Sequence, residues 1–441
     1  MFQFFYRVAC GKGAACAALF SLAASSGIAV AQSMPPVSLS LESALRLAQM
    51  RSSQLLAQDS AATASREMAV SAGQLPDPTI KIGINNLPVT SSDRFSLSRD
   101  FMTMRSVGVM QEFTRGDKRE ARAARYEREA QVADAGRVLA VANLQRETAI
   151  AWLERHYSER MREVLGQQRD EAMLQIEAAD TAYRTGKGSQ ADVFAARSAV
   201  AQIDDRIAQA DRLILGASAK LARWIGEAAT QPLDRLPVMD ALPPNSMQLD
   251  FVAAHHPQIT VLKRQEDLAQ ADVVIAQTNK RADWSAELMF SQRGPGFSNM
   301  ISINLSVPLQ WDRKNRQDRD VASKLALVDQ ARAQTEEMTR EHAAEVRGMF
   351  IEWRNNRDRL IRHDNSLIPL ASERTRAAVA AYRGGAGSLS AVLEARRGEI
   401  DARMERLRLA MDTARLWAQL NYLIPESHRS TNVSATSRSA P

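Results

Sequence analysis

Cysteine is nearly absent from this chain of 441 residues, which has only two, Cys10 and Cys16. Both lie in an N-terminal segment with a basic start and a short apolar run, which ends in a small-x-small pattern before Gln32. These are the features of a cleaved signal peptide, which we place at 1–31. Neither cysteine follows a lipoprotein pattern, so lipidation is not expected. The mature chain would lack cysteine, which excludes disulfides, thiolate metal sites and cysteine nucleophiles.

Long hydrophobic runs are also missing. After the signal peptide no stretch approaches the roughly 18 consecutive apolar residues of a transmembrane helix. The formal net charge is +6, but charges of both signs are finely mixed along the helical stretches. Such mixing is typical of solvated faces rather than of a nucleic-acid surface. Three classes remain: a soluble periplasmic protein, a secreted protein or a β-barrel.

Motifs for enzymatic chemistry are lacking as well. The segment 185–189 contains Gly-Lys-Gly-Ser, but its spacing differs from that of a phosphate-binding loop and no strand precedes it. His255 and His256 are adjacent, so on a helix they would point to different faces and chelate poorly. Three methionines, Met102, Met104 and Met110, lie in or just before the second predicted strand and could offer soft donors. Thioethers suit Cu(I) or Ag(I), but packing or surface methionine is the favoured explanation of these residues. We predict no enzyme, no cofactor and no metal site.

What the sequence does contain is a duplication. The segment YRTGKGS from Tyr183 recurs as YRGGAGS from Tyr382. This separation exceeds the period of about 20–50 residues that solenoid repeats show. We infer a duplicated fold, with a first repeat at 32–225 and a second at 248–426.

Each repeat has two stretches in which apolar and polar residues alternate, which predicts strands with one apolar face. The predicted strands lie at about 79–87, 106–113, 285–292 and 300–309. The last gives the clearest signal, because Ile301, Ile303 and Leu305 alternate with polar residues.

A very long helical stretch follows each strand pair, at about 118–183 and 315–382, and the second contains Pro369. At about 1.5 Å per residue, such a helix is on the order of 100 Å long. This length is typical of a tubular bundle or coiled coil. Each long helix ends at a glycine turn, at about 184–190 and about 383–388.

Four shorter helices are about half as long. They are predicted at about 41–74 and 250–281, before the strands, and at about 190–225 and 389–423, after the turns. One helix that precedes the strands and one that follows a turn, laid end to end, would match the length of one long helix. The Pro-rich segment 226–247 would then form an equatorial linker at mid-length, together with both chain termini. The Ser- and Thr-rich tail 427–441 is predicted to be disordered.

This order of elements resembles the TolC-like outer membrane factor family over nearly the whole mature chain. The resemblance also rests on LPDP from Leu75, VMQEF from Val109 and the two glycine turns. Four strands cannot close a barrel alone, and a sheet in lipid cannot leave an edge open. The resemblance implies a mainly α fold with a β-barrel part: a homotrimer whose twelve-stranded outer-membrane barrel continues into a periplasmic α-helical tunnel.

The resemblance further implies partners and a location. It predicts an outer-membrane duct with a long periplasmic extension, which contacts outer-membrane lipid, a periplasmic adaptor and an inner-membrane pump. The pump would be of the proton-driven resistance-nodulation-division type. Residues 75–113 are most similar to the heavy-metal-efflux branch, which makes heavy-metal cations one candidate substrate, but the sequence itself does not name the substrate.

Two groups of site residues follow from the same resemblance. Acidic residues just past the turns would ring the periplasmic mouth, and the matching positions are Asp192 and Glu394. The family tends to have another acid where this chain has Ala391, which lowers the charge of the ring. Stabilisation of a helix N-terminus is the alternative role, mainly for Asp192. The residues that would meet the adaptor are Gly186, Lys187, Gly188, Ser189, Gly385, Gly387 and Ser388.

Other functions stay open. The same fold serves ducts for drug or organic-solute efflux and for type I secretion. A non-conducting trimeric periplasmic coiled-coil scaffold is a different class, but it would not need four strands with alternating polar and apolar faces. A secreted hydrolase would need a nucleophile or metal constellation, which the sequence lacks.

Overall fold

The computed structural model describes residues 38–240, 242 and 255–425. Contacts divide the chain into residues 1–37 and a second unit that begins at Ser38, and only the second contains described residues. The predicted signal peptide and tail therefore lie outside the described residues, as does most of the second half of the predicted equatorial linker.

The described elements follow the predicted order of helix, two strands, long helix and helix, twice. In the first repeat they are α1 (Leu41–Arg51), α2 (Ser53–Ala72), β1 (Thr79–Asn85), β2 (Met104–Phe113), α3 (Gly116–Arg184), α4 (Gln190–Ile225) and the 3-10 turn η1 (Gly226–Thr230). In the second they are α6 (Pro257–Thr278), β3 (Trp284–Gln292), β4 (Met300–Ser306), α7 (Gln317–Arg362), the π turn η3 (His363–Leu367), α8 (Ile368–Arg383) and α9 (Leu389–Asn421). The predicted fold class is confirmed for the single chain: a mainly α fold with one antiparallel sheet.

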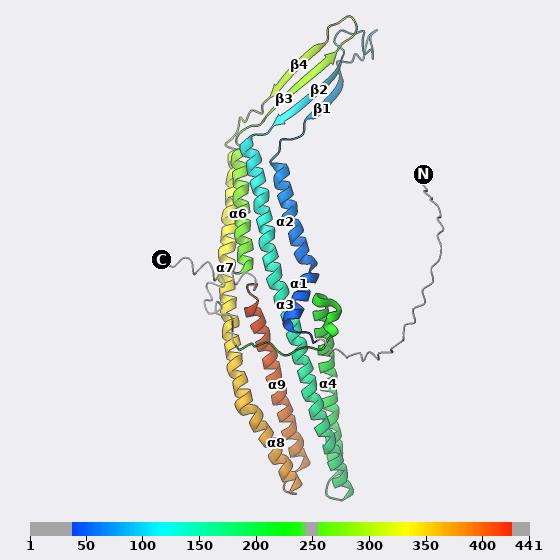
Figure 1. Ribbon diagram of the computed structural model, residues 1–441, viewed down its shortest axis with the longest axis vertical. Coiled ribbons are helices and arrows are strands. Elements are labelled where there is room, and N and C mark those ends of the chain that lie inside the picture. The colour runs from blue at the N-terminus through cyan, green and yellow to red at the C-terminus, as the bar shows by residue number, and fades with distance from the viewer. Residues whose placement is uncertain (1–37, 241, 243–254, 426–441) are drawn as a thin grey trace, which may run out of the picture. The chain divides into compact units, whose positions relative to one another are not determined.

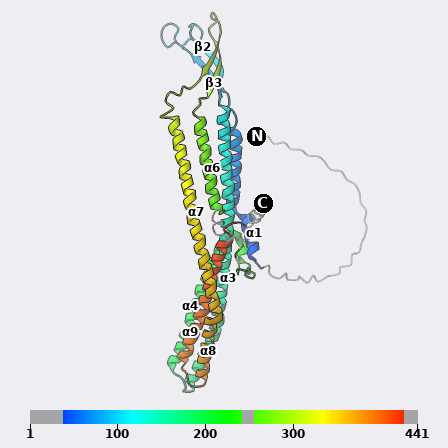
Figure 2. The same cartoon turned by 90° about the vertical axis from the view of Figure 1, so that its left-hand side faces the viewer.

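The long helix α3 has 69 residues and contains no proline. Many of its buried positions are alanines, which let neighbouring helices approach closely. α4 packs along one part of α3, and α1 and α2 pack along the other part. Figures 1 and 2 show the same arrangement in the second repeat, where α6 and α9 follow one another beside α7 and α8. Half-length helices therefore lie end to end beside long ones.

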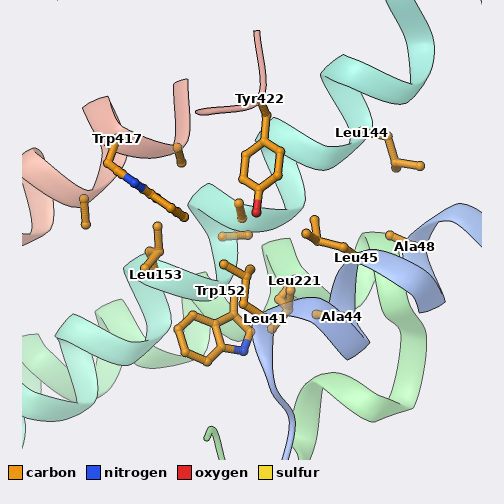
Figure 3. Packing of buried hydrophobic residues seen from close by; sticks show 14 of the residues in the cluster. Leu41, Ala44, Leu45, Ala48, Leu144, Trp152, Leu153, Leu221, Trp417 and Tyr422 are labelled. Atoms are coloured by element: carbon orange, nitrogen blue, oxygen red, sulfur yellow. The ribbon is translucent and has the colours of Figure 1, made fainter. Parts of the chain in front are cut away.

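The largest apolar cluster lies where the half-length helices meet. It joins Leu41 of α1, Trp152 of α3, Leu221 of α4 and Trp417 of α9 (Figure 3). Burying one large apolar side chain contributes about 1.5–3 kcal/mol, so this cluster is a main source of stability. Leu39 also belongs to it, and a parallel β-bridge joins Leu39 to Leu233. The start of the described chain and the start of the linker therefore meet beside the middle of α3.

Two predicted helices are interrupted. The helix expected at 41–74 breaks at Ser52, whose ψ of 103° is extended and whose hydroxyl accepts from Leu55 N at 3.4 Å. Serine competes in this way for backbone donors, and it caps a new helix, α2. The long helix expected at 315–382 contains the π turn η3. Pro369 follows directly, and its missing N–H and bulky ring disturb the regular hydrogen-bond ladder.

Another predicted helix differs at its start. The stretch expected from residue 250 is described from Pro257, which occupies the first turn of α6. The N–H groups in the first turn of a helix have no acceptor within the helix. Proline is therefore favoured there, because the N–H that it lacks would make no helical hydrogen bond. Residues 250–254 lie outside the described part.

The four strands form one antiparallel sheet in the order β1-β2-β3-β4. Ile80 of β1 is opposite Val109 of β2, and Val109 is opposite Leu288 of β3. β4 ends at Ser306, three residues before the predicted end. Pro308 has no N–H to donate to a ladder, so the polar–apolar alternation continues beyond the hydrogen-bonded strand.

Candidate functional site

The two glycine turns lie at the ends of the helices that are farthest from the sheet (Figure 1). Gly186 has a φ of 70° and Gly385 a φ of 74°, left-handed values that favour glycine. In each turn the following amide closes the preceding helix, Lys187 N on Ala182 O at 2.8 Å and Ala386 N on Ala381 O at 2.9 Å. The two repeats therefore reverse the chain in the same way.

The residues predicted to dock an adaptor are exposed at these turns, except Gly188, which is half-buried. A Cβ on Gly188 would lie 3.0 Å from the Ala182 Cβ, so glycine lets the turn approach the end of α3 this closely. Ser189 and Ser388 are the N-caps of α4 and α9. The structure thus gives these residues a local role in the turn, and it leaves most of their surface open.

Asp192 closes a capping box at the start of α4. Its carboxylate accepts from the Ser189 amide at 3.0 Å and from the Ser189 hydroxyl at 2.7 Å, while Asp192 N donates to Ser189 Oγ at 3.2 Å. The hydrogen bond from the Ser189 amide lowers the pKa of Asp192 below its ordinary value. The helix-capping role weighed for Asp192 is therefore present, and the capping carboxylate stays ionised at neutral pH.

The matching position in α9 carries no acid. There Ala391 N donates to Ser388 Oγ at 3.3 Å, which is only half of a capping box. Glu394 lies further along α9 and is exposed, with its carboxylate 2.8 Å from Arg374 Nη2 of α8. Both side chains of this pair are more than half exposed, so water screens the interaction. Asp192 and Glu394 therefore have different local environments.

The starts of α4 and α9 nevertheless share one small core. Val193, next to Asp192, and Val392, two residues before Glu394, belong to the same buried cluster. The structure thus places both predicted acids beside this cluster, on two helices from different repeats.

Ion pairs between the repeats lie nearby and could not be predicted from the sequence. Arg206 of α4 contacts Asp401 of α9 at 2.7 Å, and Arg396 of α9 pairs with Glu171 of α3. No local motif marks such residues, because each partner comes from a different repeat. Only the packing of α9 against α3 and α4 brings them together.

The sheet at the opposite end has one face that is apolar and exposed. Its side chains come from alternate positions, including Ile80, Ile82, Val107, Val109, Leu288, Ile301, Ile303 and Leu305. Ile82 is 83% exposed and Ile303 is 78% exposed, so nothing in the described chain covers this face. Exposed apolar patches of this kind mark contact with lipid or with another protein.

The other face of the sheet is polar. Lys81 of β1 forms an ion pair with Glu287 of β3 at 3.0 Å, and Asn85 Nδ2 donates to Ser106 Oγ at 2.9 Å. The register places further serines on this face. The two outer strands, β1 and β4, each have one neighbour within the described chain. Each therefore presents a free edge, which is a template for pairing with another strand.

The two histidines named from the sequence precede α6, and the three methionines lie in or just before β2. His256 caps α6 and its ring lies 3.9 Å from that of His342, measured between centroids. Met104 and Met110 share the polar face of β2, and Met102 precedes that strand. Among the described residues, no three His, Cys, Asp or Glu side chains are grouped as metal ligands. In the same part of the chain, no helix combines the length and apolarity that crossing a membrane requires.

Comparison with known proteins gives similarity at the level of structure. No protein-family model and no curated protein matches the chain. The outer membrane protein VceC from Vibrio cholerae superposes with a TM-score of 0.72 and 16% identity, over 87% of this chain and 95% of that one. The CmeC outer membrane channel of Campylobacter jejuni gives 0.66 and 13%, over 90% of this chain and 88% of its own.

A third comparison agrees with these two. The open state of the Neisseria gonorrhoeae MtrE outer membrane channel superposes with a TM-score of 0.61 and 16% identity, over 87% of this chain and 88% of that one. At sequence identities this low, the similarity is evidence for a shared fold only. Each structural match extends over nearly the full length of both chains. The chain therefore has the fold of these outer membrane channels, which is the TolC-like outer membrane factor fold that its sequence resembles.

Proposed function

We propose that this protein is the outer-membrane exit duct of a tripartite efflux system. Three copies form a channel that conducts substrate passively from a periplasmic adaptor and an inner-membrane pump across the outer membrane. The observation that carries the proposal is the four-stranded sheet, with its exposed apolar face, its polar face and its two free edges.

One arrangement would both pair the free edges of the sheet and cover its exposed apolar face. A sheet in lipid must satisfy every backbone donor and acceptor, so its edges must pair. If β4 of one copy pairs with β1 of the next, three copies close a barrel of twelve strands. The exposed isoleucines then face lipid, and the polar face that carries Lys81 and Glu287 lines the interior. The helices that continue from these strands form the walls of a periplasmic tunnel.

The glycine turns form the periplasmic mouth in this proposal. Three copies of Asp192 and Glu394 ring the opening, where fixed negative charge favours cations and disfavours anions. Asp192 is held ionised by its cap, whereas Arg374 partly offsets the charge of Glu394. The exposed turn residues around Gly186 and Gly385 meet the tip of the adaptor.

The substrate class is the finer part of the proposal. The local similarity of residues 75–113 to the heavy-metal branch favours heavy-metal cations. Organic solutes or secreted polypeptides are the alternatives, because the pump and the adaptor select what enters such a duct. The proton-driven pump supplies the energy, and the duct needs no cofactor and no catalytic residue.

Single-channel conductance in planar bilayers tests the proposal. The wild type, Asp192→Ala and Glu394→Ala would be compared, with Glu337→Ala as the matched control. Glu337 also forms an exposed ion pair with an arginine, Arg340, but it lies in α7, outside the turns. We expect cation-selective openings in the wild type and the control, and reduced selectivity in the two mouth variants.

Each contrary outcome has its own meaning. Equal selectivity of all four proteins would retain the duct and remove Asp192 and Glu394 from the mouth. A folded trimer that inserts but never conducts would overturn the duct and favour a scaffold without a pore.

A further inference from the structure

Three methionines form a diagonal row across the polar face of the sheet. The register pairs Met110 of β2 with Glu287 of β3, and Gly108 of β2 with Met289 of β3. Met110 and Met289 are therefore diagonal neighbours on one face. β3 and β4 repeat the relation, because Met289 is opposite Ser302 and Met300 is opposite Ser291.

Their position makes ordinary packing a poor explanation. The apolar face of the sheet is the other one, and the neighbours of these methionines on the polar face are serines and the Lys81–Glu287 ion pair. Met110 and Met289 are half-buried and Met300 is 43% exposed, so none of the three is enclosed in the core. Gly108 supports the arrangement, because a Cβ there would lie 3.2 Å from the Met289 Cβ.

From this row we propose a relay for a soft monovalent metal ion, Cu(I) or Ag(I), on the inner wall of the barrel. This inference rests on the proposed function, because it makes the polar face the wall of a duct. Thioether sulfur selects soft ions over Na⁺, K⁺, Mg²⁺ or Ca²⁺. Met110, Met289 and Met300 supply the sulfur ligands, and no change of oxidation state is involved.

The spacing makes two weak sites rather than one strong site. Diagonal neighbours on one face of a sheet are about 7–8 Å apart, and methionine side chains are long and flexible. Two adjacent thioethers can converge on one ion, because each methionine side chain has three rotatable bonds. Met110 and Met300 are separated by two such steps, so no single ion binds all three. Met289 is shared by both pairs.

The direction of the row suits conduction. β2 ends at Phe113, next to the long helix α3, so Met110 lies toward the helical end of the sheet. β4 begins at Met300, at the loop end of the sheet that is farthest from the helices (Figure 1). An ion that passes from Met110 through Met289 to Met300 therefore moves from the tunnel toward the outer loops. Conduction needs several sites that are weak enough to release the ion, and shared two-sulfur sites meet that need.

Silver ion titration of the full-length protein tests the relay. Single Met→Leu variants at 110, 289 and 300 would be compared with the wild type, because leucine preserves volume and removes only the sulfur. Met104→Leu is the matched control. Met104 shares the face and the strand with Met110, but it has no methionine as a diagonal neighbour. Silver nitrate in chloride-free buffer is the probe, and the K⁺ current in planar bilayers and calorimetric binding in detergent are the readouts.

We expect Ag(I) to block or slow the K⁺ current of the wild type reversibly. Loss of an outer-shell partner weakens metal binding by about 10- to 100-fold, so loss of a direct ligand in Met289→Leu should weaken Ag(I) binding at least about tenfold. Met110→Leu and Met300→Leu each remove one pair and should have smaller effects. Met104→Leu should match the wild type.

Equal Ag(I) affinity of the wild type and Met289→Leu would overturn the relay. The K⁺ current separates this result from failure of the proposed function. A protein that conducts K⁺ but shows no methionine-dependent Ag(I) binding is a duct without the relay. A trimer that never conducts K⁺ overturns the duct, and with it the relay as a path, even if calorimetry detects the two sulfur sites.

Discussion

The indole Nε1 of Trp152 donates a hydrogen bond to the backbone carbonyl of Leu39 at 3.0 Å. Trp152 lies in the middle of α3, whereas Leu39 immediately precedes the N-cap of α1. The same carbonyl accepts from Asp234 N at 3.1 Å, so one oxygen joins the start of the fold, the long helix and the segment after α4. Trp152 is completely buried in the cluster of Figure 3.

Trp152→Phe should therefore destabilise the fold. It removes a buried hydrogen bond, worth about 1 kcal/mol, and it shrinks a side chain in a closed core. We expect a loss of about 2–3 kcal/mol in the free energy of unfolding, measured by urea denaturation with helical circular dichroism as the signal. Trp311→Phe is the control, because Trp311 is 88% exposed. Equal midpoints for the two variants would contradict this role for Trp152.

Glu154 joins three helices at nearly the same level of α3. Its carboxylate lies 2.9 Å from Lys220 Nζ of α4 and 2.8 Å from Arg415 Nη2 of α9, and the side chain is 13% exposed. Glu154→Gln keeps the shape but removes the charge that Lys220 and Arg415 share, so that Arg415 keeps only Asp412 as an acidic partner. We expect a loss of about 1–3 kcal/mol, because hydrogen bonds to charged groups contribute that much.

The control for this prediction is an exposed pair on the same helix. Glu163 lies 2.6 Å from Arg160, and both side chains are more than half exposed. Glu163→Gln should change stability by no more than about 0.5 kcal/mol, because such pairs contribute little. If the two glutamine variants unfold at the same urea concentration, Glu154 is an ordinary surface residue.

Acid should weaken the fold through His256. Burial, and then the nearby His342 and Arg146, lower the pKa of His256 to about 3 from its ordinary 6.5. Burial also lowers the pKa of His342, although the nearby Glu345 and Glu341 favour its charged form. The unfolded chain takes up a proton below pH 6.5 and the folded chain does not, so stability is complete above 6.5 and falls toward pH 3. At 1.36 kcal/mol per pKa unit, the loss at pH 4.5 is about 2–3 kcal/mol.

His256→Asn tests the origin of this pH dependence. Asparagine is a good N-cap residue, so it preserves the cap of α6 but does not titrate. The variant should lose less stability between pH 7 and pH 4.5 than the wild type. His255→Asn changes the neighbouring histidine and should keep the wild-type slope. A wild-type slope in His256→Asn would assign the acid sensitivity to other groups.

The sequence predicts the order of elements here, but not how the long elements are interrupted. Period-two alternation and the glycine turns are local signals, so they predicted the strands and the reversals at Gly186 and Gly385. The break at Ser52 depends on whether the serine side chain caps a new helix or the helix continues. The π turn before Pro369 depends on how the local hydrogen bonds shift. The spacing of apolar residues does not predict either outcome. Ser52 is too common a residue to predict a boundary on its own, whereas Pro369 signals a disturbance of the helix but not its form.

The candidate site was likewise predicted only in part from the sequence. The glycines and serines of the turns belong to a local repeated motif, and the family resemblance singled out these turns and Asp192. The pairs Arg206–Asp401 and Arg396–Glu171 were missed, because their partners come from different helices. The methionine row was missed for a related reason: the parity of each strand is readable in the sequence, but the diagonal between strands requires the register.

Ala391→Asp would complete in α9 the capping box that α4 already has. The Ser388 hydroxyl accepts a hydrogen bond from the amide of residue 391, but Ala391 offers no carboxylate to the Ser388 amide. In α4, by contrast, the Ser189 amide donates to the Asp192 carboxylate. We expect the substitution to stabilise α9 by about 0.5–1 kcal/mol, which the unfolding midpoint would show. It would also add one negative charge per chain beside the start of α9, and three in the proposed trimer. If the proposed channel conducts ions past this point, its cation selectivity should therefore rise.

Ala391→Asn separates the two effects, because asparagine accepts hydrogen bonds of the same geometry but has no charge. Increased stability in both variants with higher selectivity only in Ala391→Asp would place residue 391 on the conducting path. Selectivity that stays at the wild-type value in a stable Ala391→Asp trimer would instead place the start of α9 away from the ion path. The proposed ring would then have to lie elsewhere, because Glu394 is less than one helical turn from residue 391.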